Sequence, residues 1–177
     1  MLHTLNKKSV LTGSLIAMLL MFAIVMFYAN PLIDGGNGAS LLKLQLAFDK
    51  QSGIAILDSW GSGGAARFTQ WIFTDYLYAV SYAVFFSSLL SMLIVKKAKQ
   101  NIAGYRLAVY LAFIAGLLDW TENTLEIIFV NHAAAFPESL FFLHSTVAAA
   151  KWAALPIALA CIAILLATSD KPRVHDS

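Results

Sequence analysis

Four long apolar runs, separated by shorter polar stretches, dominate the pattern of this chain. They extend over about residues 10–29, 71–95, 107–130 and 140–167. A helix needs about 20 consecutive apolar residues to cross the hydrocarbon core of a bilayer, and each run is close to or above that length. The sequence therefore predicts an all-α integral membrane protein. We expect a four-transmembrane-helix bundle that forms a single membrane domain over residues 1–177.

The first apolar run follows Lys7 and Lys8, so a secretory signal peptide is the alternative to a retained helix. The apolar region of a signal peptide is usually about 7–15 residues long and ends in small residues. The run in this chain is longer, and it ends in Phe27-Tyr28-Ala29, which is too bulky for a good cleavage site. We therefore interpret it as the first membrane span.

The polar segment between the first two runs, residues 30–67, contains several helix and turn signals. Gly35-Gly36-Asn37-Gly38 predicts a turn after the first span. A serine and an aspartate are placed to cap two short helices, over residues 40–48 and 49–60. Residues 42–46 alternate like a strand, but a lone strand would have unpaired edges. We therefore expect a short helical cap at one end of the bundle.

The distribution of basic residues predicts the orientation of the bundle. Cytoplasmic loops of membrane proteins carry an excess of Lys and Arg. The side that holds both termini has Lys7, Lys8, Lys96, Lys97, Lys99, Arg106, Lys171 and Arg173, and the other side has Lys43, Lys50 and Arg67. We expect a multi-pass protein of the cell membrane whose N- and C-termini are cytoplasmic and whose residues 30–67 face outward.

The composition agrees with a membrane protein and excludes some other classes. The chain is 59% hydrophobic and only 12% charged, whereas soluble domains contain about 25% charged residues. A net charge of +2 without a basic face gives no reason to expect nucleic acid as a partner. The single cysteine, Cys161, excludes an internal disulfide and most thiolate metal sites.

One stretch of the third run, from Leu117 to Glu126, is unusually polar for a membrane span. A charge at the centre of a bilayer costs roughly 2.5–3.5 kcal/mol on insertion scales, so intramembrane acids indicate a functional site. Seven helical residues make about 700°, which places Asp119 and Glu126 within about 20° of each other. Glu122 and Asn123 lie about 60° and 40° to either side. All four side chains therefore share one face, which we expect to point into the bundle.

The second and fourth runs also carry polar residues seven positions apart. Together with the polar face of the third run, these residues are expected to form two layers across the bundle. The shallower layer, about 6 Å from the outer ends of the runs at 1.5 Å per residue, consists of Asp75, Glu126 and His144. The deeper layer, about 16 Å inside, consists of Tyr82, Asp119 and Lys151. Tyr78 shares the face of Asp75 and Tyr82. Because both layers fall on single helix faces, we expect the three helices to meet at these residues.

Charge balance separates two interpretations of this cluster. Lys151 is expected to pair with Asp119 or Glu122, and a buried ion pair that only fixes helix register is the structural alternative. However, the runs carry four acids, Asp75, Asp119, Glu122 and Glu126, against one lysine. Burial without a partner favours the neutral form of a carboxyl. Protons, a cation or a cationic ligand must therefore complete the balance.

We predict that this cluster forms an intramembrane site for an amphiphilic, lipid-like small molecule. The candidate acid–base residues are Glu122, Glu126, Asp75 and His144, and the candidate ligand-binding residues are Asp119, Asn123, Lys151, Tyr78 and Tyr82. A metal site of Asp75, Glu126 and His144 is an alternative. The core offers only one histidine and no Glu-x-x-His pair, so no metal or cofactor is assigned.

Two other classes of function fit the same residues. Carboxylates inside a membrane also bind and release protons or cations in coupled carriers. A structural or assembly subunit would instead use them to pack against a partner. Membrane lipid is an expected partner. Many carriers are built from two repeats, and this chain shows no internal repeat, so a carrier would need a homo-oligomer to supply the second copy.

Overall fold

The computed structural model of the chain describes residues 2–33, 40–61, 63–97 and 102–168, and its regular elements are all helices. The long helices are α2 (Lys8–Ile33), α5 (Gly64–Lys97), α6 (Ile102–His132) and α7 (Glu138–Ala167), and the short ones are α1 (Leu2–Leu5), α3 (Ser40–Gln45) and α4 (Lys50–Ser59). No strand occurs within these described ranges. The all-α prediction is confirmed, and the strand alternative for residues 42–46 is wrong because α3 occupies most of that segment.

Three helices of the described chain are long and apolar enough to cross a membrane: Lys8–Asn30, Gly64–Lys96 and Glu138–Ala167. Helix α6, which carries the polar stretch, is not among them. Large apolar side chains on the outside of the helices, such as Leu20, Phe27, Leu77, Leu117 and Ile164, are more than half exposed. Soluble monomers rarely expose such surfaces over a wide area. These features indicate a membrane protein.

The helices extend beyond the apolar runs that predict them. Helix α5 begins at Gly64, seven residues before the expected start of the second span. Gly61 and Gly63, just before it, have φ angles of 68° and 93°, a left-handed conformation that favours glycine and ends the preceding helical segment. The apolar run therefore indicates which part of α5 needs an apolar environment. The glycines with positive φ determine where the helix begins.

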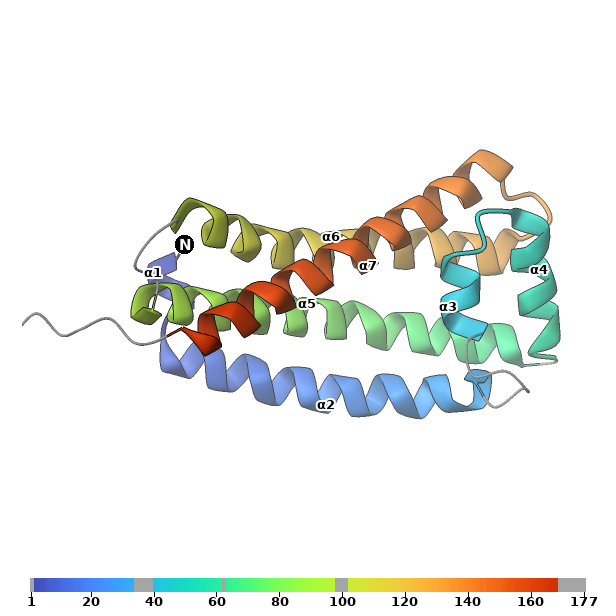
Figure 1. Cartoon of the computed structure of the whole chain (residues 1–177). Coiled ribbons are helices and arrows are strands. Elements are labelled where there is room, and N and C mark those ends of the chain that lie inside the picture. The colour runs from blue at the N-terminus through green and yellow to red at the C-terminus, as the bar shows by residue number, and fades with distance from the viewer. Residues whose placement is uncertain (1, 34–39, 62, 98–101, 169–177) are drawn as a thin grey trace, which may run out of the picture.

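The long helices pack in the order in which they occur along the chain (Figure 1). Helix α2 packs on α5, α5 packs on α6, and α6 packs on α7. Helix α7 runs obliquely across the others and also contacts α5, whereas α2 and α7 make few contacts in the described part of the chain. The seam between α2 and α7 is consequently the open side of the arrangement.

Small residues allow α5 and α6 to approach closely next to the polar cluster. A Cβ atom added at Gly116 would lie 2.8 Å from the Ala83 Cβ and 3.3 Å from the Ala79 backbone oxygen. Neither neighbouring atom belongs to a flexible side chain that could move aside. Small residues at such positions are typical of helix contacts in membranes, where van der Waals packing holds helices together.

The two short helices expected between the first two long helices are present as α3 and α4. Asp49 caps α4, and its carboxylate accepts hydrogen bonds from the backbone N–H groups of Gln51 and Ser52. The hydrogen bonds to Ser52 are the main reason that the pKa of Asp49 lies below its ordinary value. The predicted first cap helix ends earlier than expected, at Gln45, and Phe48 adopts a left-handed φ of 57°. The predicted turn at Gly35–Gly38 lies outside the described residues.

The cap is attached to α7 by hydrogen bonds that short-range sequence patterns do not indicate. The Phe48 backbone N–H donates to the Ser145 Oγ at 3.0 Å, which explains why the chain leaves the helical path there. The Trp152 indole N–H donates to the Gln45 Oε1 at 3.0 Å. At the start of α7, the Lys50 backbone N–H donates to a carboxylate oxygen of Glu138. These contacts hold α3 beside the middle of α7.

Candidate functional site

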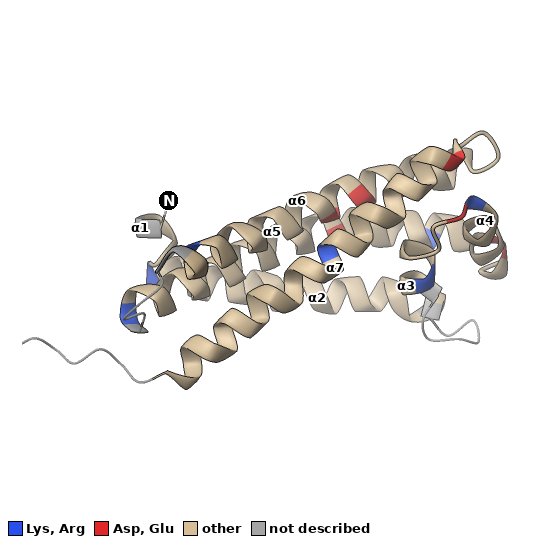
Figure 2. Cartoon of the chain, turned by 45° about the horizontal axis from the view of Figure 1, so that its top comes forward, with Lys and Arg blue, Asp and Glu red and all other residues tan. Residues whose placement is uncertain are grey.

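Charged residues gather at the two ends of the molecule, apart from one group near its middle (Figure 2). This group consists of acids on α5 and α6 and a lysine on α7. Its members are each at most 5% exposed: Asp75, Asp119, Glu122, Glu126 and Lys151. The expectation that the polar face of α6 points into the protein is therefore met.

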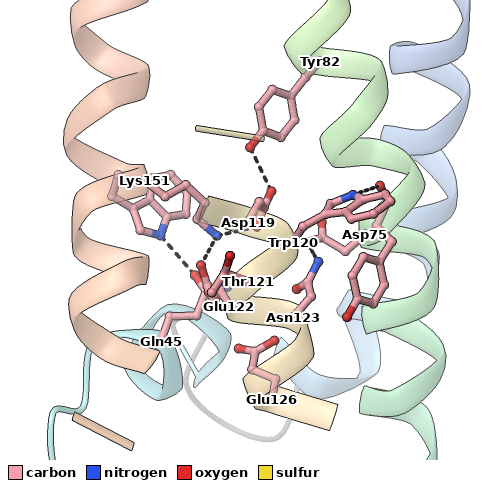
Figure 3. A network of polar contacts seen from close by, with 12 residues as sticks. Gln45, Asp75, Tyr82, Asp119, Trp120, Thr121, Glu122, Asn123, Glu126 and Lys151 are labelled. Carbon is pink, nitrogen blue, oxygen red and sulfur yellow. Dashed lines mark hydrogen bonds and ion pairs between the residues drawn. The ribbon is translucent and has the colours of Figure 1, made fainter. Parts of the chain in front are cut away.

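Lys151 extends from α7 to two of these acids, Asp119 and Glu122 (Figure 3). Its Nζ is 2.8 Å from the Asp119 Oδ1 and 2.6 Å from the Glu122 Oε2. The sequence predicted one of these two acids as the partner of Lys151, and the structure brings both to it. The contact with Asp119 is a charge-assisted hydrogen bond, a kind that contributes about 1.5–3 kcal/mol, and the contact with Glu122 is an ion pair.

The other side of the α6 face contacts α5. The Tyr82 hydroxyl donates to the Asp119 Oδ2 at 2.9 Å, so the three residues of the predicted deeper layer are in contact. One turn along, the Asn123 amide donates to the Asp75 Oδ2 at 3.0 Å (Figure 3). Asp119 therefore connects the two neighbours of α6 because each of its carboxylate oxygens contacts a different helix.

The predicted shallower layer is divided in the structure. The His144 Nε2 lies 3.3 Å from the Glu126 Oε1. Asp75, the third member, has Asn123 as its hydrogen-bond partner. Glu122 lies close to Glu126 and His144, because one ligand atom from each of these three residues is within 4.8 Å of the others. Of the candidate acid–base residues, three thus form a cluster between α6 and α7, and Asp75 stands apart on α5.

Several polar atoms of this region are fully buried and have no hydrogen-bond partner in the described structure. They include the Glu122 Oε1, the Glu126 Oε2, the His144 Nδ1 and the Asn123 Oδ1. Most buried polar atoms in proteins are hydrogen-bonded, and leaving one unsatisfied costs about 1–3 kcal/mol. The concentration of such atoms on neighbouring residues indicates a site that an additional species completes.

A cavity of about 400 Å³ lies beside the polar group, between α2, α3, α5, α6 and α7. Its polar wall is formed by Asp75, Tyr78, Tyr82, Asp119, Lys151 and Gln45, and its apolar wall by Phe22, Val25, Leu41, Leu42, Trp71, Phe86, Trp152 and Leu155. Glu122, Asn123, Glu126 and His144 do not line it. The site therefore has an open part, whose residues line the cavity, and a closed part, whose residues do not.

Some cavity residues were not predicted from the sequence. Phe22 and Leu42 look like ordinary apolar positions of a span and of a cap helix. Gln45 and Trp152 bond to each other across more than 100 residues of sequence. The local signals in the sequence are a glutamine between two leucines, Leu44 and Leu46, and a tryptophan next to Lys151.

No protein family model, curated protein or solved structure that was compared with this chain matches it. The arrangement of its own residues therefore carries the functional argument, and the roles assigned to the site residues are still predictions.

Proposed function

We propose that this protein crosses the membrane four times, with the α3–α4 cap on the outer side, and binds an amphiphile with a cationic polar group between α2 and α7. The observation that carries the proposal is the cavity of about 400 Å³, which places two carboxylates opposite a largely apolar wall. This volume lies in the range of about 300–1,000 Å³ typical of small-molecule sites.

The charges on the cavity wall favour a cationic group. Lys151 is already paired with Asp119 and Glu122, so its positive charge is neutralised. Asp75 has no ion pair among the described residues, and its hydrogen-bond partner is the neutral amide of Asn123. A buried carboxylate of this kind gains most from a partner that carries positive charge.

Aromatic rings next to Asp75 also suit a cation. Tyr78 and Tyr82 line the cavity, and their ring centroids lie 5.3 Å apart in an edge-to-face arrangement. Trp71 lines the same cavity one turn away from Asp75 on α5. The faces of aromatic rings attract ammonium groups, an interaction that strengthens when water is excluded.

The open side of the cavity favours a ligand that enters from the lipid. Phe22 on α2 and Trp152 on α7 line the cavity and are still 48% and 45% exposed. They therefore lie at its mouth, on the seam where α2 and α7 make few contacts. An alkyl chain in this seam would contact Val25, Leu155 and the surrounding lipid while its polar group reaches the acids.

The alternatives predicted from the sequence are less well supported. A subunit that used its acids to contact a partner would carry them on an outer face, whereas these acids are buried. An acid–base role would fall first to Asp75, because Glu122, Glu126 and His144 do not line the cavity. No observation specifically favours a carrier.

Binding of radiolabelled dodecylamine, compared with dodecanol, to the protein in nanodiscs tests the proposal. At neutral pH the amine is cationic and the alcohol is not, while the chain length is the same. We expect saturable binding of the amine alone and a loss of roughly tenfold to a hundredfold in its affinity in Asp75→Asn, because a charge-assisted contact is worth about 1.5–3 kcal/mol.

Asp58→Asn is the matched control, because Asp58 is an exposed acid on α4 that does not line the cavity. It should bind dodecylamine like the wild type. Equal affinities in Asp75→Asn and Asp58→Asn, or equal binding of the alcohol and the amine, would contradict the proposal.

A further inference from the structure

The closed part of the site, Glu122, Glu126 and His144, has the composition of a metal-binding cluster. Glu122 and Glu126 are one turn apart on α6, and both carboxylates contact α7, Glu122 through Lys151 and Glu126 through His144. His144 reaches them from α7, and one ligand atom of each residue lies within 4.8 Å of the others. All three are at most 2% exposed, which makes this a site inside the protein and not a surface group of acids.

A second observation independently indicates that a species is needed here. The Glu122 Oε1 and the Glu126 Oε2 are buried without hydrogen-bond partners. A structural cluster would be expected to satisfy these atoms within the fold. A positively charged species between the two helices would supply a partner to carboxylate oxygens that otherwise have none.

We propose that Glu122, Glu126 and His144 bind a divalent transition-metal cation of the zinc class. Imidazole nitrogen selects transition metals over magnesium and calcium, which prefer oxygen ligands alone. Three protein ligands that leave one position open are typical of catalytic zinc sites. With bonds of 2.0–2.1 Å, neighbouring ligands of a tetrahedral zinc ion lie roughly 3.3–3.4 Å apart. The His144 Nε2 and the Glu126 Oε1 are already 3.3 Å apart.

Lys151 is compatible with an ion at this position. Its Nζ contacts the Glu122 Oε2, which leaves the Glu122 Oε1 for the metal. Carboxylates that bind metals are commonly held in place by a second hydrogen-bonding group of this kind. The charge balance also improves. Four acids against Lys151 leave three negative charges, a divalent ion reduces them to one, and the cationic ligand proposed at Asp75 would neutralise the last.

The test uses Co²⁺ as a spectroscopic probe of the detergent-purified, metal-free protein. We expect one Co²⁺ per chain, with a visible ligand-field band typical of a tetrahedral site, and displacement of Co²⁺ by equimolar Zn²⁺. His144→Gln and Glu126→Gln should bind Co²⁺ at least about tenfold more weakly. His132→Gln is the matched control, because His132 is exposed at the end of α6, and it should behave like the wild type.

A variant that keeps a ligand separates metal binding from a purely structural role. His144→Cys in a Cys161→Ala background should add a thiolate-to-cobalt charge-transfer band, which a packing role cannot produce. Wild-type protein without a stoichiometric ligand-field band would overturn the proposal, whatever the variants do. Equal Co²⁺ affinity in His144→Gln and His132→Gln would overturn it as well. The test does not involve Asp75 or dodecylamine, so its outcome is independent of the proposed amphiphile site.

Discussion

Removing the positive charge of Lys151 is the strongest available perturbation of the buried cluster. In Lys151→Met, Asp119 and Glu122 both lose the ammonium group that lies 2.8 and 2.6 Å from their oxygens. The charge-assisted hydrogen bond to Asp119 alone is worth about 1.5–3 kcal/mol, and the ion pair with Glu122 adds to it. Breaking a buried ion pair by removing one partner costs about 3–5 kcal/mol by itself. We therefore expect Lys151→Met to lower the free energy of unfolding by about 3–5 kcal/mol.

Equilibrium unfolding in mixed micelles with increasing denaturing detergent measures this loss. Lys43→Met, which removes an exposed lysine of α3, is the matched control and should change stability little. Adding Asp119→Asn or Glu122→Gln to Lys151→Met should recover part of the stability, because the carboxylate left without a partner is then neutral. Residues in direct contact couple by about 0.5–3 kcal/mol in such double-mutant cycles.

A cycle that shows no coupling of Lys151 to either acid would contradict this prediction. Equal stability of Lys151→Met and Lys43→Met would contradict it as well. Either result would mean that the cluster holds its charges in a different arrangement from the one described. Recovery by Asp119→Asn but not by Glu122→Gln would be compatible with the structure and would identify Asp119 as the stronger partner.

Two further predictions concern topology and helix packing. In a Cys161→Ala background, a cysteine at Ser52 should react with an impermeant thiol reagent in intact cells, whereas one at Gln100 should not. The basic loops predict this result, and the opposite labelling pattern would reverse the orientation. Gly116→Ala should destabilise the protein by about 1–3 kcal/mol, because the new Cβ would lie 2.8 Å from the Ala83 Cβ. Unchanged stability in the same unfolding assay would show that α5 and α6 are farther apart.

The helices and the presence of a buried polar cluster could be predicted from the amino-acid sequence alone. Both follow from short-range rules: apolar runs of span length, an aspartate placed to cap α4, and a seven-residue spacing that returns to the same helix face. The pairing of Lys151 with Asp119 or Glu122 was also predictable, because a lone intramembrane lysine must find an acid.

The division of that cluster between α5 and α7 depends on how the helices pack in the tertiary structure. The helical angle places Glu122 and Asn123 on opposite sides of Asp119, but it does not indicate which neighbour lies on which side. Packing brings Glu122 and Glu126 against α7 and turns Asn123 toward Asp75 on α5. For the same reason, only Asp75 of the four candidate acid–base residues lines the cavity.

A polar site inside the bundle was predictable, but the apolar walls of the cavity were not, because they come from segments that are distant in sequence. The return of α3 to α7 depends on single hydrogen bonds, from Trp152 to Gln45 and from Phe48 to Ser145, which leave no periodic signal. The seam between α2 and α7 exists because α7 crosses the other helices obliquely. Local patterns determine which faces of a helix are polar, whereas the relative rotation and crossing of helices depend on side-chain packing along the whole chain.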